Sequence, residues 1–194
     1  MVIAKMWVLL AHTSPSSMKN FLRRIKLIDT LLIELPISQA LFVARLHNQV
    51  LPGKAGGIIP ANEKFYKGEQ KYIGTVTDDG FKIRRRRKMF DFNINFSVAE
   101  GTLQEQGEKL LVETEIQGFV GVLKLILPLS LAFYGFAFLI SLLPEEGSSA
   151  EGFFFPFLLV HAVFFYTIAY IIMRWGVTKM KRTLEREFFF LTKE

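Results

Sequence analysis

The most conspicuous chemical groups in the sequence are five successive cations, Arg84, Arg85, Arg86, Arg87 and Lys88. Alternate side chains of a strand point to opposite faces, so this run sends charge to both faces of a sheet, which a buried strand would not accept without pairing. The pattern therefore predicts a strand end or a sheet edge. Three interpretations stay open: a solvated edge that resists aggregation, a surface for anionic lipid headgroups at about 1 kcal/mol per cation, and, least favoured, a surface for nucleic acid.

A second group of cations lies near the C-terminus, in VTKMKRTLEREFFFLTK at 177–193. Lys179, Lys181, Arg182 and Arg186 lie away from an apolar stripe whose members recur every three or four residues: Val177, Met180, Leu184, Phe188 and Leu191. This spacing is typical of a basic amphipathic helix. The stripe is expected either to lie in the inner membrane interface or to dock on the rest of the chain or on a partner.

His161 is a titratable residue deep in an apolar segment, which makes it a functional candidate. Five hydroxyl-bearing residues are candidates to lie near it: Tyr166, Thr167 and Tyr170 on the same segment, and Ser130 and Tyr134 on the other apolar segment. A neutral histidine bonded to one of these hydroxyls is favoured over a proton relay. Two helices cannot enclose a pathway, so transport would require an oligomer.

Residues for catalysis are not arranged in any recognisable pattern. The chain has no cysteine, which excludes a thiol nucleophile, a disulfide and a thiolate metal site. Glu113 and Glu115 alternate outward on a predicted strand, as solvated residues do, and no glycine-rich phosphate loop is present. We therefore expect no enzyme activity, no cofactor and no metal.

Two long apolar segments must carry the histidine and its neighbours. Residues 118–143 contain one charge, Lys124, and residues 153–173 contain none. Each is longer than the roughly 18 residues that a membrane-spanning helix needs. Of 20 phenylalanines in the chain, 13 lie after residue 117, so this half is expected to contact lipid. The sequence predicts a transmembrane helical hairpin.

Charge indicates the orientation of this hairpin. The connecting turn, 144–152, holds three Glu and no Lys or Arg, whereas the region before the first span holds 17 Lys and Arg. Lys and Arg mark the cytoplasmic side of a membrane. We therefore expect both termini, including the tail 174–194, on the cytoplasmic side of a bacterial inner membrane.

The remaining residues predict a cytoplasmic α+β domain at 21–117, preceded by an arm at 1–20 that is either disordered or upstream of a start at Met18. A strand at 25–35 ends at Pro36, and Ser38 is expected to cap a helix whose apolar face is Ala40, Leu41, Val43, Ala44 and Val50. A turn-rich loop, 51–70, follows.

Antiparallel strands complete this domain. Asp79-Gly80 predicts a tight hairpin turn. The segment 90–98 alternates apolar and polar residues, as a half-buried strand does. Gln106-Gly107 predicts a second turn, followed by a strand that points Leu110, Val112 and Ile116 inward. The total expected is five strands and one helix.

The stretch GTVTDDGFKIRRRRKMFDFNINFSVAEGTLQEQGEKLLVETEI, 74–116, with its short motif Gly80–Arg84, resembles a family of small, uncharacterised bacterial two-span membrane proteins. The resemblance implies a strand–helix segment before the hairpin core, two spans and a basic amphipathic tail, and it implies no activity. The chain departs from the family at Gln117-Gly118, where a basic residue and a proline are usual.

Together these patterns favour a non-enzymatic binding or scaffold protein at the inner membrane face, in contact with anionic lipid or a protein partner. The alternative is an oligomeric transport or channel component that uses the hairpin. Membrane lipids, a protein partner or further copies of the chain are the expected partners, and nucleic acid is not.

Overall fold

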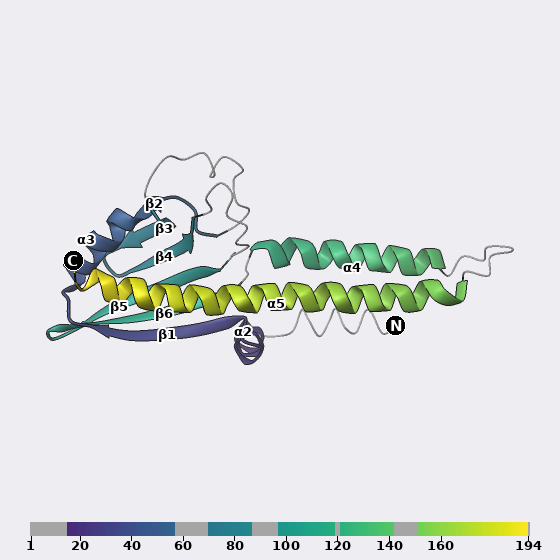
Figure 1. Cartoon of the computed structure of the whole chain (residues 1–194), viewed down its shortest axis with the longest axis horizontal. Helices are drawn as coiled ribbons and strands as arrows, with labels where there is room; N and C mark the ends of the chain where they lie inside the picture. The colour runs from purple at the N-terminus through teal and green to yellow at the C-terminus, as the bar shows by residue number, and fades with distance from the viewer. Residues whose placement is uncertain (1–14, 57–69, 87–96, 119–120, 142–150, 194) are drawn as a thin grey trace.

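The structure is a computed structural model, and it describes residues 15–56, 70–86, 97–118, 121–141 and 151–193. It consists of a sheet domain and two long helices that extend from one end of it (Figure 1). The described strands form one sheet in the order β1-β6-β5-β4-β3-β2. Their bounds are β1 Ile28–Leu35, β2 Val50–Pro52, β3 Tyr72–Thr77, β4 Gly80–Arg85, β5 Val98–Gln106 and β6 Lys109–Gln117.

The sheet has six strands and is mixed, whereas the sequence predicted five antiparallel ones. Strand β5 shares only Val98 with the predicted strand 90–98, and a further strand that was not predicted is β2, which pairs in parallel with the start of β3. Strand β2 has only three residues and ends in Pro52, and the sequence predicts the last two of them as the start of the loop 51–70. A strand this short carries no periodicity of its own and is defined by its partner.

Both predicted hairpin turns are present. In the first, the Thr77 hydroxyl donates a hydrogen bond to the Gly80 carbonyl oxygen over 3.0 Å. In the second, Gly107 has a φ of 65°, a conformation that glycine adopts without a steric cost. The alternating segment 90–96 lies outside the described residues. The strand that leads into the second turn is β5, which begins only at Val98.

The core lies between one face of the sheet and two helices, α3 (Gln39–Gln49) and the C-terminal half of α5 (Glu151–Leu191). On β6, the inward residues Leu110, Val112 and Ile116 are each 0% exposed, as predicted.

Helix α3 begins where it was expected, but two details of the prediction are wrong. Ser38 occupies the N-cap position, yet its side chain makes no cap hydrogen bond. The buried face is that of Phe42 and Leu46, spaced one helical turn apart, while Leu41 is 45% exposed. Of the predicted face, Val50 is buried and Val43 packs against the core, whereas Leu41 and Ala44 are exposed.

Helix α5 is continuous over 41 residues, through the predicted boundary between span and tail at 173–174. Its C-terminal stripe packs into the core of the sheet domain, with exposed fractions of 2% or less at Val177, Met180, Leu184, Phe188 and Leu191. The stripe therefore docks on the chain itself and does not lie in a membrane interface. Phe188 contacts the Phe42 and Phe81 rings edge-on, with centroid distances of 5.4 and 5.6 Å.

Helix α4 (Gly121–Ser141) runs beside the apolar half of α5 (Figure 1). Among the described residues, one helix, Pro156–Leu191 of α5, is long and apolar enough to cross a membrane. The apolar segment Pro128–Leu139 of α4 is shorter. The structure thus provides one candidate span, and the two-span hairpin stays a prediction.

Helix α2 (Pro15–Arg24) replaces part of the predicted N-terminal arm, so the domain begins before residue 21. It ends in a Schellman motif, in which the Lys26 amide donates to the Arg23 carbonyl and the Leu27 amide to the Leu22 carbonyl. Lys26 adopts a φ of 58°, the left-handed conformation that this motif requires. Residues 1–14 lie outside the described part of the chain.

Candidate functional site

The arginine run lies at the end of β4, as predicted, but not at a sheet edge. Strand β4 is paired on both sides, with Arg84 opposite Ile73 of β3 and Val98 of β5. Arg84 and Arg86 are each only 6% exposed, so these two residues of the run are not solvated. Arg87 and Lys88 lie outside the described residues.

The cations of α5 have different surroundings. Lys181 forms an ion pair with Asp29 of β1 over 2.9 Å, which ties the helix to the sheet. The Lys179 ammonium lies 4.9 Å from the centre of the Trp175 ring, a cation–π contact. Arg182 and Arg186 are exposed on the helix.

The structure brings members of the two basic segments together in one small cavity. Arg85 and Arg86 at the end of β4 and Arg186 of α5 line a pocket of about 200 Å³. Sequence reasoning missed the other residues that line it, which include Lys71, Tyr72 and Glu187. Lys71 and Glu187 form an ion pair over 2.7 Å although 116 positions separate them. Nothing in the local pattern of either segment indicates this pairing.

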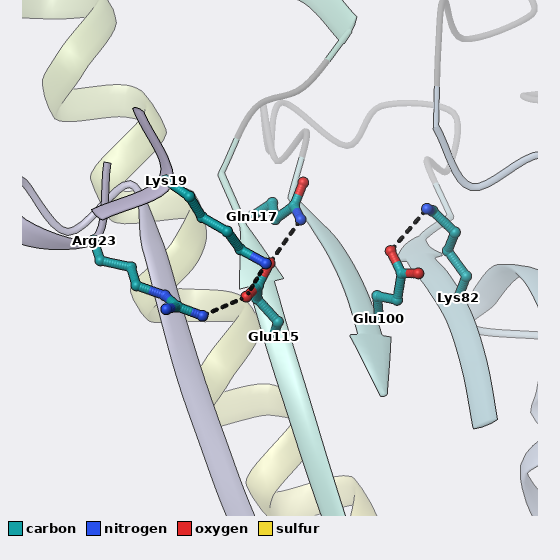
Figure 2. A network of polar contacts seen from close by, with 6 residues as sticks. All are labelled: Lys19, Arg23, Lys82, Glu100, Glu115 and Gln117. Atoms are coloured by element: carbon teal, nitrogen blue, oxygen red, sulfur yellow. Dashed lines mark hydrogen bonds and ion pairs between the residues drawn. The ribbon is translucent and has the colours of Figure 1, made fainter. Parts of the chain in front are cut away.

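The opposite face of the sheet carries a polar network (Figure 2). Glu100 of β5 and Glu115 of β6 are direct cross-strand partners, an arrangement that is unfavourable for two carboxylates. Lys82 neutralises Glu100 over 2.8 Å. Lys19 and Arg23 of α2 each approach Glu115 to 2.8 Å.

Glu115 is therefore not the merely solvated residue that its alternation suggested. Partial burial raises the pKa of its carboxyl group, but hydrogen bonds from Lys19, Gln117 and Arg23 outweigh burial, so the pKa lies below its usual value. The Gln117 amide donates one of these bonds over 2.9 Å. The ionised carboxylate thus holds α2 against the outer face of the sheet.

His161 is bonded to a hydroxyl, as the sequence predicted. The Tyr134 hydroxyl of α4 lies 2.9 Å from Nδ1 of His161 on α5. A second pair, Ser130 and Tyr166, joins the same two helices over 2.7 Å between their hydroxyl oxygens. These bonds fix α4 antiparallel to α5, and they give His161 a structural partner.

Where the long helices leave the sheet domain, backbones and side chains meet closely. The Gly118 amide donates to the Leu27 carbonyl over 2.8 Å, and the Tyr170 hydroxyl donates to the Ile25 carbonyl over 3.1 Å. A Cβ atom on Gly118 would lie only 2.7 Å from Cγ2 of Val177, so the chain passes α5 at a distance that only glycine allows.

Exposed aromatic and basic residues surround this junction. Phe21 of α2 is 59% exposed and Trp175 of α5 is 56% exposed. Arg24 and Lys26 are exposed at the end of α2. We call these four residues and Lys179 the junction collar. In Figure 1, α2 is seen almost end-on while α5 runs across the picture, so α2 lies crosswise to the long helices.

No family model, curated protein or solved structure matches the chain. In the part of the chain that the structure describes, no group of three or more His, Asp or Glu side chains could hold a metal ion.

Proposed function

We propose that the protein is a non-enzymatic binding module anchored in the bacterial inner membrane, with its sheet domain on the cytoplasmic surface. The observation that carries this proposal is the continuity of α5. Phe157, Leu159 and Val160 point in different directions around its N-terminal half and are 66%, 56% and 64% exposed. The C-terminal half of the same helix is core of the sheet domain. Helix α5 thus connects an apolar surface that is compatible with lipid to a folded domain that is compatible with water.

The connections of the domain support a second crossing by α4. Strand β6 ends at Gln117 and leads into α4, while α5 re-enters the same domain at Val177. Both ends of the helical pair therefore lie on one side. If α5 crosses the membrane, the chain between these two points must cross in the opposite direction, and α4 is the helix available to do so.

The junction collar supports contact with anionic lipid. Tyr170 donates to the carbonyl of Ile25, the residue that follows α2, at the level where the apolar half of α5 ends. A helix at this depth that lies crosswise to the anchor is parallel to the membrane surface, with Phe21 available to the acyl boundary and Arg24 and Lys26 to headgroup phosphates. Trp175 suits the same layer, where amphipathic rings are enriched.

The absence of cysteine makes topology directly testable. In single-cysteine variants of the full chain, Ser148→Cys should react with an impermeant maleimide added outside spheroplasts. Glu105→Cys, in the sheet domain, should react only after permeabilisation. Equal reaction of both from the same side would contradict the hairpin, and complete extraction of the protein by alkaline carbonate would contradict the anchor.

The lipid contact needs a separate measurement. With a fluorophore attached through Phe21→Cys in proteoliposomes, spin-labelled lipids should quench the emission. A fluorophore attached through Glu105→Cys is the matched control and should not be quenched. Adding Arg24→Gln and Lys26→Gln should weaken the enrichment of anionic over zwitterionic lipid around the Phe21→Cys probe. Equal quenching at both sites would contradict a specific contact between the junction collar and lipid.

The alternative, an oligomeric transport or channel component, has less support. His161 is the ionisable group that motivated it, and its ring nitrogen is bonded to Tyr134 within one chain. Crosslinking in native membranes that yields a fixed oligomer through the α4 and α5 faces would favour this alternative.

A further inference from the structure

The pocket where the two basic segments meet is lined by residues at the adjacent ends of β3 and β4 and by residues of α5. The Arg86 amide donates to the Lys71 carbonyl over 2.9 Å, which continues the β3–β4 pairing just beyond β4. This bond places Lys71, Arg85 and Arg86 side by side. Arg186 and Glu187 of α5 close the pocket from the side. Four cations therefore surround about 200 Å³ of space together with a single carboxylate, which already has Lys71 as its partner.

The Tyr72 hydroxyl provides an independent observation. The side chain is 1% exposed and lines this pocket, yet its hydroxyl has no hydrogen-bond partner. An unpaired buried hydroxyl costs roughly 1–3 kcal/mol, so such groups are usually satisfied by a water or a ligand. Burial and the nearby Glu187 raise the pKa of Tyr72 against the opposing effect of Arg85 and Arg186, so the hydroxyl keeps its proton and can donate.

We infer that this pocket binds a small phosphate-type oxyanion, held by Arg85, Arg186 and the Tyr72 hydroxyl. Guanidinium groups bind phosphate in a bidentate manner, and a hydroxyl donor completes the set of contacts. A bound cation would face four positive charges. A volume of about 200 Å³ is below the roughly 300–1,000 Å³ of sites for drug-sized molecules, which suits a phosphate or a small phosphomonoester.

This inference goes beyond the proposed function, because the pocket lies within the sheet domain and does not require a membrane. Two sources can supply the same chemistry: a free phosphate or phosphomonoester, and a phosphomonoester lipid headgroup. Thr183, which lines the pocket, lies eight residues beyond Trp175 of the collar, which is about 12 Å along α5 at 1.5 Å per residue.

The test is isothermal titration of the full chain in nonionic detergent with inorganic phosphate, at constant ionic strength set by chloride. Tyr72→Phe keeps the ring in the core and removes only the hydroxyl, and it should raise the Kd about tenfold, as expected for one hydrogen bond to an ion. Arg186→Gln changes an exposed side chain that the fold does not bury, and it should raise the Kd by more than tenfold.

Lys109→Gln is the control, because it removes a cation from the hairpin at the other end of the sheet and should leave the Kd within about twofold. If phosphate does not bind but short-chain phosphatidic acid does, with the same pattern among the variants, the ligand is a lipid headgroup. If neither ligand binds, or Tyr72→Phe and Arg186→Gln leave the Kd unchanged, the pocket holds only water and the inference is wrong.

Discussion

Replacing Phe188 by alanine tests whether the C-terminal stripe of α5 is core or membrane surface. Phe188 is 1% exposed and contacts two other rings, whereas its neighbour Phe189 is 54% exposed. Truncation of a buried phenylalanine costs about 3–5 kcal/mol, and the two ring contacts place Phe188 toward the upper part of that range. We expect Phe188→Ala to lower the free energy of unfolding of the sheet domain by about 4 kcal/mol.

The assay should report on opening of the sheet domain, separately from any change in the apolar parts of α4 and α5. Ala99→Cys places a single thiol at a position that is 0% exposed on β5, in a chain with no other cysteine. The labelling rate of this thiol measures how often the domain opens. A cost of 4 kcal/mol corresponds to labelling that is faster by about a thousandfold.

Phe189→Ala is the matched control, with the same change one residue along the helix, and should accelerate labelling less than about fivefold. If the stripe lay on lipid instead, neither variant would affect opening of the sheet. Equal effects of Phe188→Ala and Phe189→Ala on labelling would therefore refute the packing of α5 described above.

Three further predictions concern other parts of the molecule. Because the folded pKa of Glu115 is lowered, its contribution to stability is complete above the unfolded pKa of about 4.3 and is lost as pH falls below it. The free energy of unfolding, measured from pH 7 to 3, should therefore fall more steeply for the native chain than for Glu115→Gln. Parallel profiles would contradict the network. Lys26→Gly should raise the free energy of unfolding by about 1 kcal/mol in denaturant titrations, since glycine adopts the φ of 58° without strain, whereas Gly107→Ala should lower it. Tyr134→Phe should weaken the pairing of α4 with α5 by about 0.6 kcal/mol, measured by thermal unfolding in detergent. An equal loss from Tyr134→Phe in the His161→Ala background would show that the two side chains are not coupled.

Local patterns predicted most of the elements correctly. The alternation at Leu110, Val112 and Ile116 reflects a strand with one face in the core, and the Gly107 turn follows from the backbone freedom of glycine. Where the prediction was wrong, the deciding contact was distant along the chain. Strand β2 exists because β3 pairs with it, and the buried face of α3 is the one that meets the Phe188 ring.

The candidate site shows the same division. The two basic segments were identified from composition, and the run 84–88 was expected at a strand end or a sheet edge because a buried strand would not accept consecutive cations without pairing. The path of α5 across the sheet brings Arg186 to the same pocket as Arg85. It also buries Tyr72 beside them with no hydrogen-bond partner for its hydroxyl. No window of sequence around either arginine contains this information.

The sequence by itself determined the apolar character of the C-terminal half, the basic character of both ends and the amphipathic stripe from Val177 to Leu191, since these depend only on residue type and helical period. Only the tertiary structure decided what the stripe contacts, because lipid and a sheet face offer the same apolar surroundings to Leu184 and Phe188. The structure also decided that α2 lies against Glu115. The physical reason is that periodicity specifies which side of an element is apolar, whereas the identity of its partner depends on chain segments more than 60 residues away.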